Sequence, residues 1–449
     1  MRKNLLLAAV SMSLILGNTN MIKANPINNI LAQQQQTEVK FVDPVLENAI
    51  RKQLGISKKT PLTVDKLAKI TELKIENDGL LAKITELKIE NDDFFKGFFN
   101  SDDEEIKSLA GIEKLKNLTS LSLVYHKIKD IKLLAELSNL TYLKLEGNQI
   151  TDIKPLSRLS NLTYLNLMSN QITDISPLSG LFNLTDLSLG YNENKFFCCS
   201  LPQTNVVGNK ITDIKSLSGL SNLKQLSLSG NQITDIKPLS GLSNLKQLSL
   251  GYNQIKDINP LSGLSNLSYL NLMSNQIKDI KHLSALSNLT NLNLMLNQIT
   301  DIKHLAGLSN LTYLTLSGNE ITDIKPLSGL SNLILLYLIE TQIKDIKPLS
   351  SLSNLTNLNL MSNQITDIKP LSGLSKLEWL FLGDNQITDI KPLSGLSKLE
   401  LLDLRENQIT DIQPLSGLSK LTQLNFEGNP ITNCVGLPEE LMSMCPENK

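Results

Sequence analysis

Leucine and isoleucine recur along most of the chain at a fixed spacing, in the pattern L-x-x-L-x-L-x-x-N-x-I. In the stretch that starts at Leu140, Leu143 and Leu145 alternate with non-aliphatic residues, which is the period of a short strand with one buried face. The segment that follows carries Pro and Ser, which disfavour a regular helix, so turns and short 3₁₀ pieces are expected there. The remaining aliphatic positions are predicted to point inward: Leu140, Ile150, Ile153, Leu156 and Leu159.

The pattern has a period of 22 residues and gives 14 turns, with a leading partial turn at 104–115. Asn occupies one position of nearly every turn; His126 and Thr341 replace it in two turns, and Asn192 and Asn209 compete for one slot. An Asn amide carries donors and an acceptor, so it is expected to bond to backbone groups of its own turn and the next. Left unpaired in an aliphatic core, each such group would cost about 1–3 kcal/mol.

This pattern is the signature of a leucine-rich repeat solenoid. Each turn contributes one strand, and neighbouring strands stack about 4.8 Å apart in a parallel sheet. The sequence therefore predicts an α/β horseshoe with a parallel sheet on its concave face and 3₁₀ turns on its convex face.

A helical N-terminal cap is predicted at FVDPVLENAIRKQLGI. Asp43 is expected as the N-cap, Pro44 as the first helical residue and Gly55 as the stop. The face that covers the first turn is expected to comprise Val45, Ala49, Ile50 and Leu54. Together with the N-x-I-x-D-I-x-P-L repeat, this segment makes the sequence from Phe41 to Ile431 resemble the internalin-like leucine-rich repeat proteins of bacteria. The resemblance implies an extracellular protein-recognition module.

Four parts are expected along the chain. Arg2 and Lys3 precede a 13-residue apolar run, 5–17, which is shorter than the roughly 18–20 residues of a membrane span and predicts a secretory signal peptide. Residues 1–32 hold this signal and the start of the mature chain, with cleavage at 24 or 32. A cap over 33–105, the repeats over 106–432 and a C-terminal cap over 433–449 follow. Neither a Leu-Pro-x-Thr-Gly sorting motif nor an immunoglobulin-like segment is found, so wall anchoring and host-cell invasion are not expected.

Three segments interrupt the array. LAKITELKIEND occurs at 67–78 and again at 81–92, a duplication inside the cap. DFFKGFFNSDDE at 93–104 carries four Phe residues that are expected to pack on the cap, the alternative being an exposed patch. Deleting 193–209 restores the repeat register, so this insertion is interpreted as a surface loop.

The composition narrows the chemistry. Lys plus Arg is 43 and Asp plus Glu is 44, so the net charge of −1 argues against a nucleic-acid partner. With aromatics at 4%, the core must be aliphatic. Motifs such as G-x-S-x-G and His-Glu-x-x-His are missing from the sequence, so neither an enzyme nor a cofactor is expected.

The three His and four Cys residues offer little for a metal site. His282 and His304 share one column, but two His residues are too few for zinc, and a repeated Asp column is expected to accept backbone N–H groups rather than bind calcium. Cys434 and Cys445 are expected to form a disulfide that pins the C-terminal cap, the alternative being two free thiols. The adjacent pair at 198–199 is too strained to bridge easily.

A concave patch is predicted near the C-terminal end of the array, because the polar strand positions change character there. Exposed aromatic side chains are costly to leave in water and are enriched at interface hot spots. The predicted ligand-binding residues, the last two as a polar rim, are Leu335, Tyr337, Ile339, Met361, Trp379, Phe381, Leu401, Asp403 and Arg405. A second set, Tyr142, Tyr164, Tyr269 and Tyr313, is interpreted as too dispersed to be one site.

The leading hypothesis is a secreted, periplasmic or cell-surface module that is not an enzyme and binds a protein ligand. It is expected to be a monomer, with no nucleic-acid partner and no membrane insertion of the mature chain. The alternative is a structural envelope or extracellular-matrix scaffold without a specific ligand, and the third hypothesis is an effector delivered into another cell.

Overall fold

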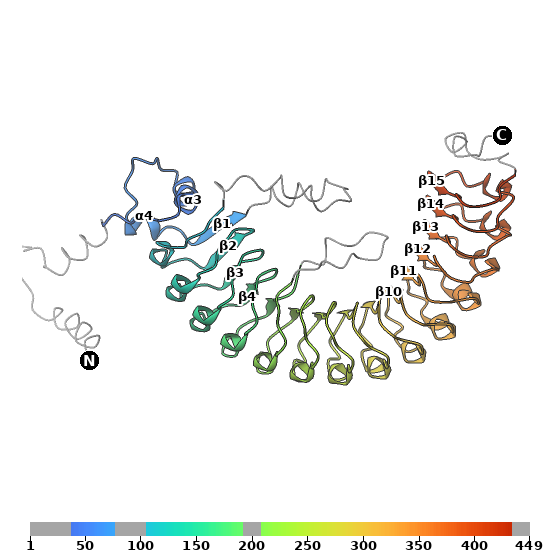
Figure 1. The fold of residues 1–449 in the computed structure, drawn as a ribbon, viewed down its shortest axis with the longest axis horizontal. Helices are drawn as coiled ribbons and strands as arrows, with labels where there is room; N and C mark the ends of the chain where they lie inside the picture. Colours follow the sequence, from blue (N-terminus) through green and yellow to red (C-terminus); the bar gives the residue numbers. More distant parts are fainter. Residues whose placement is uncertain (1–36, 77–104, 192–207, 433–449) are drawn as a thin grey trace, which may run out of the picture.

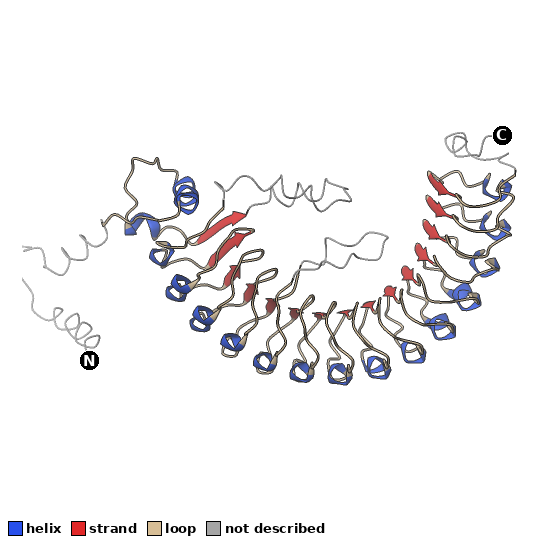
Figure 2. Ribbon diagram, in the orientation of Figure 1, coloured by secondary structure: helices blue, strands red, loops and turns tan. Residues whose placement is uncertain are grey.

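The protein forms one curved solenoid (Figure 1). The computed structural model describes residues 37–76, 105–191, 208–432. A single 15-stranded sheet, with strands in sequence order and all pairs parallel, lines the inner edge of the arc. The 3₁₀ helices lie along the outer edge (Figure 2). This arrangement confirms the predicted leucine-rich repeat horseshoe with its 3₁₀ convex face and helical cap.

The strands are short, because aliphatic and other residues alternate over only a few positions of each 22-residue turn. They are β1 (Glu72–Glu76), β2 (Ser120–Val124), β3 (Tyr142–Lys144), β4 (Tyr164–Asn166), β5 (Asp186–Ser188), β6 (Gln225–Ser227), β7 (Gln247–Ser249), β8 (Tyr269–Asn271), β9 (Asn291–Asn293), β10 (Tyr313–Thr315), β11 (Leu335–Tyr337), β12 (Asn357–Asn359), β13 (Trp379–Phe381), β14 (Leu401–Asp403) and β15 (Gln423–Asn425).

The outer turns carry the 3₁₀ helices. They are η3 (Ile112–Lys114), η4 (Lys132–Glu136), η5 (Lys154–Arg158), η6 (Ser176–Leu178), η8 (Lys215–Leu217), η9 (Lys237–Leu239), η10 (Asn259–Leu261), η11 (Lys281–Ala285), η12 (Lys303–Leu305), η13 (Lys325–Gly329), η14 (Lys347–Ser351), η15 (Lys369–Leu371), η16 (Lys391–Leu393) and η17 (Gln413–Leu415). In each turn that carries it, the Asp before the 3₁₀ helix accepts the backbone N–H two residues later, as Asp152 does from Lys154 at 2.9 Å. The predicted role of the Asp column is confirmed.

The core is a continuous aliphatic column between the sheet and the outer turns. In the turn that begins at Leu140, every aliphatic residue predicted to point inward is at most 1% exposed. Burying one such side chain contributes about 1.5–3 kcal/mol. Because each turn buries its residues only against its neighbours, stability accumulates turn by turn.

The Asn column forms a hydrogen-bonded ladder through this core. Asn148 accepts the N–H of Ile128 at 3.1 Å and donates to the carbonyl oxygens of Leu123 at 2.9 Å and Leu145 at 3.0 Å. The expectation of bonds to a turn's own backbone is confirmed, but the other partner is the preceding turn, not the next. The reason is geometric: each Asn lies just after its strand, beside the loop that follows the strand of the preceding turn.

One slot of this ladder had two candidate residues in the sequence, Asn192 and Asn209. Asn209 fills the contested slot: it accepts the N–H of Ile172 at 2.9 Å and donates to the carbonyl of Leu189 at 2.7 Å. Asn192 lies outside the described residues, as does nearly all of the insertion. The structure describes the chain up to Tyr191 and again from Gly208.

The N-terminal cap is built around α3 (Pro44–Leu54) and the short α4 (Val64–Leu67). As predicted, Asp43 caps α3, accepting from the N–H groups of Val45 and Leu46, and Gly55 ends it at φ 65°. The other carboxylate oxygen of Asp43 accepts the N–H of Lys107 at 2.8 Å, so one side chain ties the helix to the first partial turn.

The buried face of α3 differs in part from the prediction. Ile50 is fully buried as expected, but so is Leu46, which the prediction omitted, whereas Val45, Ala49 and Leu54 are half-buried. A helix packs its residues at intervals of three and four, and here the stripe through 46 and 50 faces the repeats. Within the described residues, no helix combines the length and apolar character needed to cross a bilayer.

The duplicated segment of the cap supplies the first strand of the sheet. Its first copy forms β1, which pairs in parallel with β2, Leu73 opposite Leu121. The second copy, the Phe-rich segment, the export segment at 1–32 and the flank at 433–449 lie outside the described residues, as do all four cysteines.

Candidate functional site

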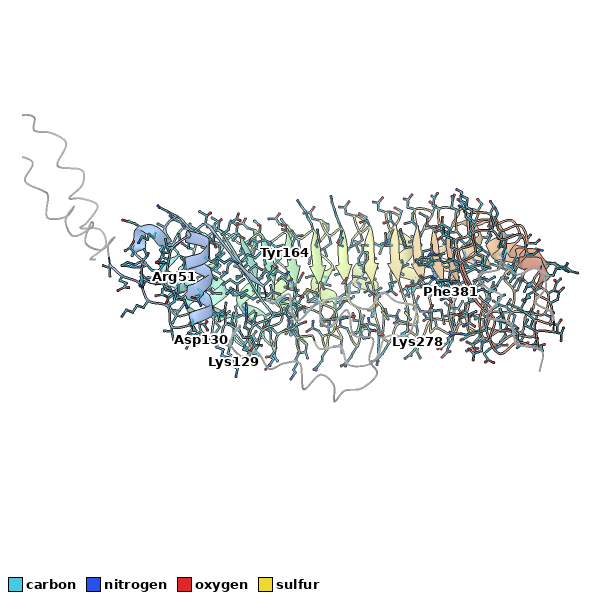
Figure 3. The ribbon with its side chains drawn as sticks, turned by 90° about the horizontal axis from the view of Figure 1, so that it is seen from above. Arg51, Lys129, Asp130, Tyr164, Lys278 and Phe381 are labelled. Carbon is cyan, nitrogen blue, oxygen red and sulfur yellow. The ribbon has the colours of Figure 1, made fainter. Side chains whose placement is uncertain are left out.

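The nine predicted binding residues come from four consecutive strands, β11 to β14, and the residues that follow them. In register, Leu335, Asn357, Trp379 and Leu401 form one row across the sheet. Tyr337, Asn359, Phe381 and Asp403 form the next row. We call these two rows, with Ile339, Met361 and Arg405 beyond them, the C-terminal face. Figure 3 shows the strands side by side, with Phe381 toward one end of the row and Tyr164 toward the other.

Exposure is unevenly shared within the C-terminal face. Trp379 is 42% exposed, one of four large hydrophobic side chains left open to solvent in the described part of the chain. Phe381 and Met361 are each 8% exposed, and Leu335, Tyr337, Ile339 and Leu401 are half-buried. Trp379 is therefore the projecting apolar group, while Phe381 and Met361 are buried and form the floor of the face.

Arg405 lies across the floor of the face. Its Nε is 3.5 Å from Oδ2 of Asp403 and 4.0 Å from Oδ2 of Asp384, and its Nη2 is 3.9 Å from the sulfur of Met361 two strands away. Gly383, two residues after the end of β13, makes this reach possible, because a Cβ there would lie 2.8 Å from Cγ of Arg405. The arginine is held in one orientation by its two carboxylates.

Asp403 is 8% exposed, and burial raises its pKa above the ordinary value even though Arg405 and its backbone N–H act in the opposite direction. Its carboxylate also accepts the N–H of Arg405 at 3.1 Å. Asn359 repeats this bond, accepting the N–H of Met361 at 3.1 Å. A side chain that bonds two residues ahead holds the strand exit and fixes where the following side chain emerges.

The tyrosines near the N-terminal end correct one sequence interpretation. Tyr142 and Tyr164, taken as part of a dispersed set, stack face to face with ring centroids 4.3 Å apart and an interplanar angle of 9°. Burial, followed by the proximity of Tyr164, raises the pKa of Tyr142 to about 12. Tyr269 and Tyr313 lie on β8 and β10, away from this pair. The sequence interpretation did not apply the 22-residue spacing to Tyr142 and Tyr164, which occupy the same position on adjacent strands.

A second asparagine column, which ends at Asn354, lies before the strands from β2 to β12 and was also missed. Asn139 donates its side-chain N–H to the carbonyl of Lys116 at 2.9 Å, and Asn161 repeats the bond to Ser138. The signal in the sequence was the Asn that recurs every 22 residues before the strand, as at 117, 139 and 161. These amides bind each turn to the one before it.

The outer face carries the His pair and the Asp column. His282 and His304 follow lysines in η11 and η12. Among the residues the structure describes, no group of three or more His, Cys, Asp or Glu side chains is placed to hold a metal ion. Backbone N–H bonds lower the pKa of Asp174, Asp213 and Asp279, so these carboxylates act as turn acceptors.

Comparison with known proteins places this geometry among repeat proteins. A family described as Leucine Rich repeats (2 copies) matches residues 116–158, 138–180, 205–241, 243–285, 287–329, 331–373, 375–415 and 397–439. No curated protein sequence matches the chain.

Solved structures give closer comparisons. An internalin (inlF) from Listeria monocytogenes is 34% identical with a TM-score of 0.65, and the match covers 86% of this chain and 96% of that one. A leucine-rich repeat protein from Leptospira interrogans is 27% identical with a TM-score of 0.66, covering 84% of this chain and 98% of that one. The functional domain of InlJ from Listeria monocytogenes, which includes a cysteine ladder, is 24% identical with a TM-score of 0.63, covers 85% and 78%, and shows the fold alone.

Proposed function

Because the chain belongs to the internalin-like leucine-rich repeat proteins of bacteria, we propose that it is a secreted, periplasmic or cell-surface module that binds a protein ligand without catalysis. Solenoids of this kind present an extended concave surface, which suits recognition of another macromolecule. Export rests on the apolar segment behind Arg2 and Lys3. The molecule acts as a monomer, with the ligand inside the arc.

The observation that carries the proposal is Trp379. A tryptophan that is 42% exposed on β13, above a floor of Phe381 and Met361, is costly in water and gains free energy when a partner covers it. A spacer without a ligand has no use for such a group on its sheet. Asp403 and Arg405 supply a polar edge beside it.

The test uses extracellular protein domains displayed on yeast and selected for binding to the array. Trp379→Ala combined with Tyr337→Ser should weaken binding of the selected domains at least about tenfold, since truncating a central aromatic anchor costs about 2 kcal/mol or more. Phe381 stays in place because it is buried and its truncation would leave a cavity.

The matched control is Phe182→Ser. Phe182 is 58% exposed but precedes β5 outside the C-terminal face, in a column that is otherwise mostly Ser. This variant should bind as the parent does. Equal binding by a well-folded Trp379→Ala, Tyr337→Ser variant would place the ligand elsewhere on the solenoid.

A further inference from the structure

Acidic side chains gather along one side of the C-terminal face, where the strands end. Glu340, Asp384 and Glu406 each stand immediately before the ladder position of their turn, and Glu427 follows β15 beside Arg405 in the strand register. All four are exposed. We call these four residues the acidic rim.

The fold does not require acids at these positions. The backbone before the ladder residue is left-handed, with φ 53° at Glu340, 56° at Asp384 and 49° at Glu406, a conformation that glycine adopts at least cost. Gly147, Gly230 and Gly318 occupy the same position in other turns. The local contacts of these carboxylates are few: Asp384 has a 4.0 Å contact with Arg405 and a 3.5 Å bond from the hydroxyl of Ser362, both at the long limit for such contacts. The charge at this position therefore points to something outside the chain.

The acidic rim coincides with the apolar patch. Outside the C-terminal turns, the same position holds neutral residues wherever the structure describes it, including Ser169, Ser274 and Leu296. The charge therefore accompanies Tyr337, Ile339 and Trp379 and is not a general property of the array.

The chain itself neutralises little of this charge. Arg405 is 4.0 Å from Asp384, but its nearer partner is the buried Asp403 at 3.5 Å. Within the described ranges, Glu340, Glu406 and Glu427 make no ion pair with Lys or Arg. At the opposite ends of the strands the charges are balanced, since Glu378 and Glu400 alternate there with Lys376 and Lys398.

We propose that the protein ligand of the C-terminal face presents Lys or Arg side chains beside the apolar group that covers Trp379. This inference rests on the proposed function and adds the chemistry of the partner. Glu340 and Asp384 lie two strands apart and Asp384 and Glu406 one strand apart, so the matching cations are spaced by about 10 Å and 5 Å. Complementary charge steers the encounter and repels acidic competitors, while the apolar contact supplies affinity.

The experiment is a selection from a displayed library of random 16-residue peptides, sequenced after rounds on four forms of the full chain. The forms are the parent, Asp384→Lys with Glu406→Lys, Trp379→Ala, and the control Ser169→Lys with Ser274→Lys. The control introduces two lysines at the same backbone position of other turns, away from the face.

The parent should enrich peptides with Lys or Arg near an aromatic or aliphatic residue, and these peptides should not bind the Trp379→Ala form. The charge-reversed form should enrich Asp or Glu instead, and the control should select as the parent does. A milder pair, Asp384→Asn with Glu406→Gln, should bind the parent's peptides about fivefold more weakly, the effect expected for two rim ion pairs. It also covers the case in which the charge-reversed form does not fold.

Each other outcome identifies which idea fails. Peptides that need Trp379 but show no excess of Lys or Arg would overturn the cationic ligand and leave the binding face intact. Peptides that bind Trp379→Ala as well as the parent, or a selection that enriches none, would count against the proposed function itself.

Discussion

At the scale of single residues, His126 shows how one side chain can take over the hydrogen bonds of another. It replaces Asn in the ladder and is 4% exposed. Its Nδ1 accepts the N–H of Ile106 at 3.3 Å, and its Nε2 lies 3.2 Å from the carbonyl oxygen of Ile75. A carbonyl only accepts, so Nε2 carries the proton and the ring is neutral.

This geometry makes the junction between the cap and the repeats sensitive to acid. Burial lowers the pKa of His126 below its ordinary 6.5, and the neighbouring carboxylates Glu105 and Asp43 only partly oppose the shift. As pH falls, the imidazole of His126 therefore takes up its proton first in the unfolded chain. The stability of the folded protein that depends on neutral His126 is present above about pH 6.5 and is lost as pH falls below that value. The predicted melting temperature falls between pH 7.5 and 5.5.

His126→Asn should remove most of that pH dependence, because the asparagine keeps both hydrogen bonds without titrating. Circular-dichroism melting curves at both pH values, for the two proteins in parallel, provide the measurement. An identical pH dependence in the variant would mean that other groups cause it.

Thr341 breaks the ladder in the turn that carries Tyr337. Its hydroxyl donates to the carbonyl of Leu338 at 2.9 Å, but it cannot reach back as Asn does, and no hydrogen bond from the N–H of Ile321 is found among the described residues. The next residue, Gln342, has a strained φ of 61°. The irregular backbone lies directly behind the C-terminal face.

Thr341→Asn should stabilise the protein by about 1 kcal/mol, because it supplies an acceptor to a buried N–H. Urea unfolding at pH 7.5 measures the change, with Thr341→Val as the matched control that should destabilise by removing the hydroxyl. A Thr341→Asn variant no more stable than the parent would show that the turn cannot relax to the regular geometry.

At the scale of elements, the turn interrupted by the insertion is regular on both sides of it. The described residues end at Tyr191 and resume at Gly208 and Asn209. Gly208 packs closely on the next turn, since a Cβ on it would lie 2.2 Å from the carbonyl oxygen of Gly230. Joining Tyr191 to Asn209 would recreate the sequence L-G-Y-N that another turn carries at 250–253. The repeat can therefore close without the insertion.

Deleting residues 192–208 should leave the fold intact and stabilise it by about 1 kcal/mol, since a shorter loop costs less entropy to close. Thermal melting and a far-ultraviolet spectrum compare the two proteins. Loss of cooperative unfolding would show that the insertion packs against the array and is part of its structure.

At the scale of the whole molecule, strand pairing and the Asn ladder connect neighbouring turns. Every strand between β1 and β15 pairs with the ones before and after it, and each ladder Asn joins two successive turns. Such an array behaves as a chain of similar units whose stabilities nearly add. One complete turn is therefore expected to be removable, provided that the register is kept.

Deleting the 22 residues 232–253 should give a folded protein in which β6 pairs with β8. At about 0.05–0.15 kcal/mol per residue, the free energy of unfolding should fall by about 1–3 kcal/mol. Deleting 21 residues, 233–253, is the control: it shifts every later side chain by one position and should prevent cooperative folding. Equal stability of the two deletions would contradict the nearest-neighbour description.

Much of this protein was determined by local sequence. The strand period, the aliphatic core, the Asp acceptors and the cap of α3 at Asp43 all depend on neighbours within one turn, and the 22-residue spacing repeats them. The same spacing was enough to bring the residues from Leu335 to Arg405 onto adjacent strands.

The tertiary structure decided what depends on contacts between turns. Only stacking shows that Trp379 projects while Phe381 is covered, that Arg405 crosses Gly383 to reach Met361, and that Asn209 rather than Asn192 completes the ladder. Each outcome depends on which side chain stands one or two strands away. A pattern read along the chain fixes the face of a residue, but its exposure and its partners are set by the neighbouring turns.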